Sequence, residues 1–209
     1  VVISDETRNI KNKIEQQGVP IKEQNILINY GIKTGCDTAY FLTQEQRDSI
    51  INKCSSEEEK LRTNLIIRPM LRGRNILKYN VEWNKMWMIN FHNGIRGKLS
   101  PLSIEDYPAI KEHLDKYLVR LTKRSDKGDT PYNLRNCAYV QAFDAPKIIY
   151  PETTKFMPFY YDEKGYLTAK TCFIMTGEHL SFLTAFFNSS LFKYCFRDDF
   201  GTLFGGARS

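Results

Sequence analysis

The chain has 209 residues, 42% of them hydrophobic and 26% charged, and its formal net charge is +6. These values are typical of a globular protein with one large domain, long enough to bury a core without disulfides or metal ions. No stretch approaches the ~20 apolar residues of a membrane span, and the N-terminus lacks the apolar core of a signal peptide. We therefore expect no membrane partner.

The cysteine pattern also argues against a fold held together by disulfide bonds or a zinc ion. There are five, at positions 36, 54, 137, 172 and 195, and no two have C-x-x-C spacing. An odd number at these spacings favours reduced thiols in a cytoplasmic protein. The three histidines are scattered and form no metal-ligand pattern.

The positive charge is unevenly distributed along the chain. Between Arg62 and Lys98 there are eight Lys or Arg residues and one acidic residue, Glu82. Such a distribution is expected of a surface that binds nucleic acid, although a solvated basic surface is the alternative.

A helix is predicted at the N-terminus. Ser4 is a good N-cap, and Gly18 and Pro20 would end the helix. We interpret residues 1–20 as a linker helix and residues 21–209 as the main domain.

Two strands are predicted next, around a loop that contains glycine. The apolar run at 26–28 predicts the first strand, and the run at 39–42 predicts the second. Gly31 and Gly35 lie between them, where glycine allows backbone N–H groups to turn toward one side and bind an anion.

Lys33 and Thr34 add a cation and a hydroxyl donor to this loop, so Lys33, Thr34 and Gly35 are candidate phosphate-binding residues. A simple connection between strands is the alternative. A nucleotide P-loop is disfavoured, because Ile32 precedes Lys33 where that motif needs glycine, and because the next segment is predicted as a strand.

Two capped helices follow. Thr43 with Gln46, and Ser56 with Glu59, have the spacing of capping boxes. The sequence Glu58-Glu59-Lys60 also matches the E-x-K fragment of a nuclease motif. It lies in a capped helix without an upstream Pro-Asp partner, and we interpret it as solvated surface.

Residues 67–79 form the second candidate segment. Arg72 and Arg74 bracket Gly73, which lets another backbone come close. The two guanidinium groups are candidate phosphate clamps, and pairing with the acidic helix nearby is the alternative. Residues 86–91 then predict a buried strand.

The third candidate segment surrounds a helix predicted over residues 106–121. Before it, the loop from His92 to Ser100 carries Arg96 and Lys98. After it comes a polar loop at 123–128, and then the sequence Thr130-Pro131-Tyr132-Asn133-Leu134-Arg135-Asn136. Asn can pair with adenine and Arg with guanine, although Asn and Tyr are also common turn and core residues. With the family resemblance given below, the candidate base-reading residues are Arg96, Lys98, Tyr132, Asn133, Arg135 and Asn136.

The remaining chain predicts strands and an aromatic helix. Strands are expected at 147–151 and 171–175, with a hairpin turn at Asp162-Glu163-Lys164-Gly165. Thr176 is expected to cap a helix that is interrupted at Asn188-Ser189-Ser190 and lies mostly in the core.

Enzyme signatures are absent at usable spacing. The chain has no N-P-P-Y or D-P-P-Y sequence for amino methylation of a base and no G-x-G-x-x-G. We therefore expect no catalytic residues, metal site or cofactor in this chain itself.

The order of several short blocks resembles one family, over about residues 20–206. The blocks begin with the loop from Tyr30 to Gly35, which is followed by Ala39-Tyr40-Phe41. Together they resemble the TaqI-like C-terminal specificity domain of adenine-specific DNA methyltransferases and type IIG restriction–modification enzymes. Cys36-Asp37 and Tyr40 depart mildly from the usual pattern, where Asn and Phe are commoner. The other matching blocks are Pro69 to Ile76, Trp83 with Trp87, Asp106 to Ile110, Thr130 to Tyr139, Pro146 to Pro151, Thr176 to Leu180, and Leu183 to Phe192.

The resemblance implies an α+β fold, with a mixed, largely antiparallel twisted sheet and peripheral helices. It implies binding to double-stranded DNA beside an upstream methyltransferase domain of the same chain, in the cytoplasm of a bacterium or archaeon. The parent protein would use S-adenosylmethionine, and Mg²⁺ if a nuclease domain is present. A protein–protein scaffold module, or a nucleic-acid-binding domain outside restriction–modification, remains an alternative. Blocks shared by a family also suit a scaffold role.

Overall fold

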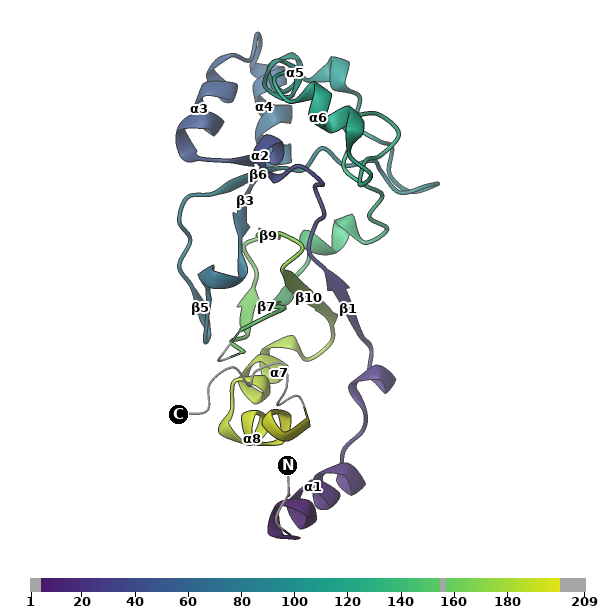
Figure 1. Cartoon of the computed structure of the whole chain (residues 1–209), viewed down its shortest axis with the longest axis vertical. Helices are drawn as coiled ribbons and strands as arrows, with labels where there is room; N and C mark the ends of the chain where they lie inside the picture. The colour runs from purple at the N-terminus through teal and green to yellow at the C-terminus, as the bar shows by residue number, and fades with distance from the viewer. Residues whose placement is uncertain (1–4, 155–156, 200–209) are drawn as a thin grey trace.

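The computed structural model describes residues 5–154 and 157–199, and its fold is α+β. Figure 1 shows β-strands in the middle of an elongated molecule, with most of the helices gathered at its two ends. The N-terminal helix α1 (Asp5–Gln17) lies at one extremity, beyond the strands. The predicted Ser4 cap lies outside the described residues.

The first sheet is antiparallel and has the strand order β1-β10-β7-β8. Its edge strand β1 is formed by the first predicted strand, and its other members come from the C-terminal third of the chain. The bounds are Ile26–Tyr30 for β1, Cys172–Gly177 for β10, Lys147–Pro151 for β7 and Tyr160–Asp162 for β8.

The second sheet is mixed and has the order β2-β6-β3-β9, with β3 and β9 parallel. The described residues thus form two four-stranded sheets, where the family resemblance implied one sheet. Their strands are β2 (Phe41–Leu42), β6 (Trp87–Ile89), β3 (Ile67–Leu71) and β9 (Leu167–Thr168), and a separate hairpin joins β4 (Ile76–Leu77) to β5 (Asn80–Val81).

The predicted hairpin around residues 162–165 is wrong. The turn forms, but β8 pairs with β7 in the first sheet while β9 pairs with β3 in the second. The Asp162 carboxylate explains the change of sheet: it accepts hydrogen bonds from the N–H groups of Lys164 at 3.0 Å and Tyr166 at 2.9 Å. It also pairs with Lys147 at 2.6 Å, and both side chains are fully buried.

The strand predicted at 39–42 is confirmed only for its second half, β2, because residues 39 and 40 belong to the short helix α2 (Asp37–Tyr40). The predicted capping box of Thr43 and Gln46 is confirmed at the start of α3 (Gln44–Asn52). Ser56 caps α4 (Glu57–Ile66), since its hydroxyl accepts from the Glu59 N–H. The helix predicted over 106–121 is divided into α5 (Pro108–Asp115) and α6 (Leu118–Lys123).

At the C-terminal end, α7 (Leu180–Phe187) and α8 (Ser190–Asp199) are interrupted where the sequence predicted. Thr176 does not cap α7, because it still belongs to β10, and His179 is the N-cap residue with a φ of 55°. Short 3₁₀ turns lie at Ile21–Glu23, Gly73–Asn75, Ile104–Asp106 and Val140–Phe143.

The main core joins the helices α2 to α6 to the strands, and it includes residues of both sheets, such as Ile149 of β7 and Ile174 of β10. Tyr40, Met70, Met88, Phe91 and Leu114 are all completely buried there. A smaller cluster joins β7, β8 and β10 to α7, with Ile148 and Phe187 among its members. Ile32 and Cys36 of the loop after β1 belong to this core. The core therefore fixes the position of the loop that carries the candidate residues Lys33, Thr34 and Gly35.

Glu59 corrects the interpretation of Glu58-Glu59-Lys60 as solvated surface, because its side chain is only 2% exposed. Its carboxylate accepts from the N–H and hydroxyl of Ser55, both at 2.8 Å, and from the N–H of Ala109 at 2.9 Å. Ala109 lies in the first turn of α5, whose N–H groups lack partners within the helix. Glu59 therefore joins α4 to α5 and is structural.

We expect replacement of Glu59 by Gln to lower the free energy of unfolding by about 2 kcal/mol at pH 7, through loss of charge-assisted hydrogen bonds. Burial raises the pKa of Glu59, but the hydrogen bonds from Ala109 and Ser55 outweigh it and hold that pKa below its usual 4.5. A lowered folded-state pKa stabilises the protein above the unfolded value and loses its effect as pH falls. The difference between wild type and variant should thus shrink below about pH 4.5 in urea titrations.

The exposed neighbour Glu58 provides the control, and its replacement by Gln should change stability by less than about 0.5 kcal/mol. Equal effects of the two substitutions would show that Glu59 has no special structural role.

Candidate nucleic-acid interface

The loop after β1 is fixed by a close approach between two backbones. The Gly31 N–H donates to the Cys172 carbonyl at 2.8 Å, and the Ile32 N–H donates to the Thr168 carbonyl at 2.7 Å. A Cβ atom on Gly31 would lie 2.0 Å from the Ala169 carbonyl oxygen. Glycine is needed here because of this contact, which holds the loop against the tight turn formed by residues 169–172.

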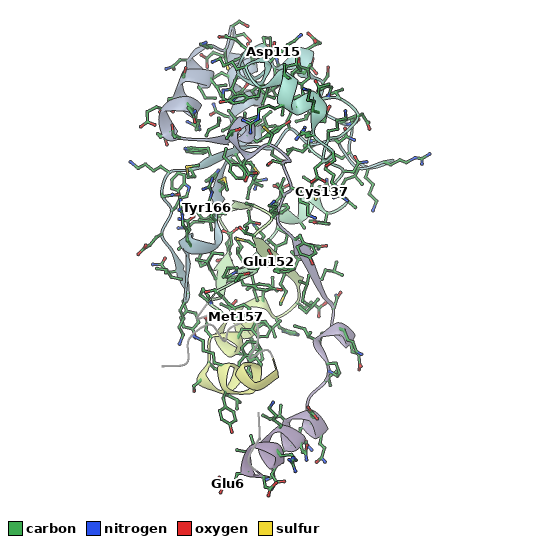
Figure 2. All side chains as sticks on the ribbon, in the orientation of Figure 1. Glu6, Asp115, Cys137, Glu152, Met157 and Tyr166 are labelled. Atoms are coloured by element: carbon green, nitrogen blue, oxygen red, sulfur yellow. The ribbon has the colours of Figure 1, made fainter. Side chains whose placement is uncertain are left out.

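Arg72 and Arg74 border the other side of the same turn. A Cβ atom on Gly73 would lie 3.7 Å from the Thr171 carbonyl oxygen, and Glu152 donates its N–H to that oxygen at 2.9 Å. A shallow hollow of about 290 Å³ is lined by Arg72, Arg74, Glu152 and Thr171, and Figure 2 labels Glu152 near the middle of the molecule. The two predicted phosphate-binding segments are therefore neighbours in space.

The three candidate residues of the first loop have different environments. Lys33 is exposed, and its ammonium lies 5.8 Å from the centre of the Tyr30 ring. Thr34 is 2% exposed, and its hydroxyl donates to Asp37 and accepts the Cys36 N–H at 3.2 Å. Gly35 is exposed with a φ of 64°. The Thr34 hydroxyl is thus used within the loop, and Lys33 carries the charge that a ligand would meet.

Arg124, directly after α6, holds the loop to a distant segment. Arg124 is 8% exposed, and its guanidinium donates to the Thr34 carbonyl, to the Tyr40 hydroxyl at 2.7 Å, and to the carbonyls of Pro131 at 3.0 Å and Asn133 at 2.5 Å. One side chain therefore connects the first candidate loop to the third candidate segment.

Tyr40 extends this connection, because its hydroxyl donates to the Tyr132 carbonyl at 2.7 Å. Burial raises the pKa of the Tyr40 phenol above its usual value, and the nearby Arg124 charge only partly opposes this. The phenol therefore keeps the proton that it donates. The Tyr132 side chain bonds elsewhere, to Asp115 at 2.6 Å, an interaction that raises the pKa of Tyr132 to about 12.

Asn133 is part of the scaffold. It is 1% exposed, and its amide nitrogen donates to the carbonyls of His92 at 3.1 Å and Leu102 at 3.0 Å. Its amide oxygen accepts from the Thr130 hydroxyl. With these groups bonded inside the chain, no polar atom of its side chain is presented to a base.

The loop after β6 forms a small hairpin that presents Arg96 and Lys98. Ile95 and Leu99 exchange backbone hydrogen bonds of 2.8 and 2.9 Å, and both basic side chains are exposed. At its base, the Nδ1 atom of His92 accepts the Gly94 N–H at 3.2 Å. Burial lowers the pKa of His92, which favours the neutral ring required for that bond. In Figure 1 this loop projects sideways from the molecule.

The hairpin and the third segment enclose an open hollow of about 850 Å³. Arg96 and Lys98 line one part of it, and Asn136 and Cys137 line another; Figure 2 labels Cys137. Asn93 connects the two parts, since it donates to Asn136 and accepts the Asp129 N–H at 2.9 Å. The hairpin and the segment therefore form one surface.

Arg135 is exposed next to this hollow and pairs with Asp126 at 3.0 Å. Sequence reasoning did not single out Asp126, Asn93 or Arg124, because a polar residue in a loop has no spacing signal that reveals buried partners. Arg124 follows Lys123 in a polar stretch of the sequence, and nothing in that stretch indicates that its side chain is enclosed.

Two groups of features are not found in the part of the chain that the structure describes. No set of three or more His, Cys, Asp or Glu side chains is arranged to hold a metal ion. No described helix is long and apolar enough to cross a membrane.

The comparisons with known proteins identify the family. A model of the TaqI-like C-terminal specificity domain matches residues 68–204, more than half of the chain, and the chain therefore belongs to this family. Among solved structures, it is similar to the type IIL restriction–modification enzyme MmeI, solved in complex with DNA, with a TM-score of 0.55 and 15% sequence identity. The match covers 81% of this chain but only 21% of the MmeI chain, so this chain spans about a fifth of that enzyme.

The close approach at Gly31 generates a stability prediction. Replacement of Gly31 by Ala should cost about 3 kcal/mol of unfolding free energy, because the new methyl group would overlap the Ala169 backbone. Gly97 at the hairpin tip provides the matched control: a Cβ there meets nothing within 4 Å, and its φ of 74° costs alanine about 1 kcal/mol. Urea unfolding would measure both. Equal losses would show that the turn can move away from Gly31.

Proposed function

We propose that this chain recognises a DNA target sequence for an attached DNA methyltransferase that modifies the N6 atom of adenine. The arrangement that best supports this is the joining of the three candidate segments, far apart in sequence, on one scaffold through Arg124 and the turn at 169–172. Membership of a specificity-domain family supports the same function. The parent protein would bind S-adenosylmethionine in its methyltransferase part.

Phosphate binding is proposed for Lys33, Arg72 and Arg74. Within the described residues none of the three forms an ion pair, whereas cations of the helices α3 to α5, such as Lys53 with Glu112 and Lys111 with Glu105, do. An unpaired cation beside a shallow hollow gains most from a phosphate, because no carboxylate must be displaced. Phosphate contacts of this kind position a protein on DNA without reading its sequence.

Base reading is proposed for four exposed residues around the large hollow: Arg96, Lys98, Arg135 and Asn136. Arg can pair bidentately with a base edge in the major groove, and Asn136, whose amide oxygen already accepts from Asn93, can donate from its amide nitrogen. Asp126 contacts only one nitrogen of Arg135, at 3.0 Å, which leaves further guanidinium donors for a base. Tyr132 and Asn133 support this surface from within.

The finer identity of the parent enzyme is part of the proposal. MmeI is a restriction–modification enzyme, and the resemblance to adenine-specific and type IIG enzymes suggests that the parent of this chain methylates adenine and carries a nuclease domain that uses Mg²⁺. Exposed apolar residues such as Leu27 on β1 and Phe182 on α7, which are 66% and 68% exposed, suit contact with the catalytic part of the same protein.

The first test of this proposal is the salt dependence of DNA binding. The chain should bind duplex DNA with an affinity that falls steeply as salt rises, because neutralised phosphates release counterions. Replacing Arg72 and Arg74 by Ala should weaken binding to all sequences alike and reduce the slope of log K against log salt by about one unit for each lost contact. An unchanged slope would remove both arginines from the interface.

The second test concerns sequence specificity. In the full methyltransferase, replacing Arg135 by Ala should weaken binding to the preferred site by about 1–3 kcal/mol and relax one position of the methylated motif. Sequencing of methylated DNA would show the motif. If the motif stays intact while the protein loses stability, Arg135 belongs to the scaffold.

A further inference from the structure

A third hollow, of about 320 Å³, lies beside the loop that follows β1. Three cationic side chains line it, and each comes from a different part of the fold: Lys33 from the loop, Arg120 from α6, and Lys170 from the turn between β9 and β10. All three are exposed. Arg120 and Lys170 have no role in the candidate surface described so far.

Both carboxylates of this hollow are hydrogen-bonded or ion-paired to neighbouring groups. Asp37 accepts the Thr34 hydroxyl, and Asp126 pairs with Arg135. Within residues 5–154 and 157–199, no ion pair involves Lys33, Arg120 or Lys170. Three cations and two carboxylates line the hollow, so its net charge is positive and favours an anion.

The backbone beneath each cation is held in place. Arg120 lies one helical turn before Arg124, and its carbonyl accepts the Arg124 N–H at 3.1 Å. Arg124, directly after α6, turns its guanidinium into the core toward Thr34, whereas Arg120, within α6, lies at the hollow. Lys170 lies in a turn closed by the Cys172 N–H, which donates to the Ala169 carbonyl at 3.0 Å.

We propose that Arg120 and Lys170 join Lys33 in binding a phosphodiester group of the DNA backbone. The turn that carries Lys170 also borders the hollow of Arg72 and Arg74 through Thr171. Lys170 thus lies between the two proposed phosphate-binding segments and makes them one continuous strip. This inference rests on the proposed function and adds two residues to it.

The test measures the binding of the chain to a short DNA duplex of mixed sequence, over a series of salt concentrations. Replacing Lys170 or Arg120 by Ala should each reduce the slope of log K against log salt by about one unit, to the same extent for unrelated duplexes. Replacing Lys170 by Arg should keep the wild-type slope, since the positive charge is kept. Lys164, which is exposed in the turn before β9 whereas Lys170 lies in the turn after it, is the matched control. Its replacement by Ala should leave the slope unchanged.

Urea unfolding of each variant separates lost binding from lost folding, and the exposed positions of both cations predict unchanged unfolding midpoints. If the Lys170 and Arg120 variants keep the wild-type slope while the Arg72 and Arg74 variants lose theirs, this inference is overturned and the proposed function stands. If the unaltered chain shows no salt-dependent binding to DNA, the proposed function itself fails.

Discussion

The buried guanidinium of Arg124 is the interaction on which the arrangement of the candidate surface depends. A buried charge is costly unless it is well hydrogen-bonded, and Arg124 has no carboxylate partner among the described residues. Its charge is compensated by oxygen atoms of Thr34, Tyr40, Pro131 and Asn133. All of these oxygens must be present together, so the loop after β1, the helix α2 and the segment at 131–133 are ordered as one unit.

This requirement separates residues that build the surface from residues that can act on a ligand. Thr34 and Asn133 have polar side chains whose bonding atoms are used inside the chain. Lys33, Arg96 and Asn136 are exposed beside them. In a buried polar network, each satisfied group adds rigidity and each unsatisfied group is expensive. The amide and hydroxyl groups of these buried side chains therefore hold the segments in position, and the exposed side chains beside them are mostly cationic.

Much of the local structure could be predicted from the sequence, because its signals are local. The Thr43–Gln46 capping box and the helix interruption at Asn188 depend on residues a few positions apart. Pairing between distant segments could not be predicted in this way. The turn at 162–165 was predicted correctly, but nothing local shows that Asp162 binds a buried lysine and that the chain then enters another sheet. The same limit hid the burial of Glu59, whose partner Ala109 is 50 residues away.

The candidate site shows the same division within a single segment. In Tyr132-Asn133-Leu134-Arg135-Asn136, the buried pair Asn133 and Leu134 is followed by the exposed pair Arg135 and Asn136. This pattern lacks the alternation of a strand and is too short to establish a helical period, so periodicity alone cannot assign the roles. The division follows from tertiary contacts: Leu134 donates its N–H to the Phe91 carbonyl at 2.8 Å, and Asn133 fastens the segment to His92 and Leu102. A short block of sequence can thus hold buried scaffold residues and exposed residues side by side, with the buried part positioning the exposed part.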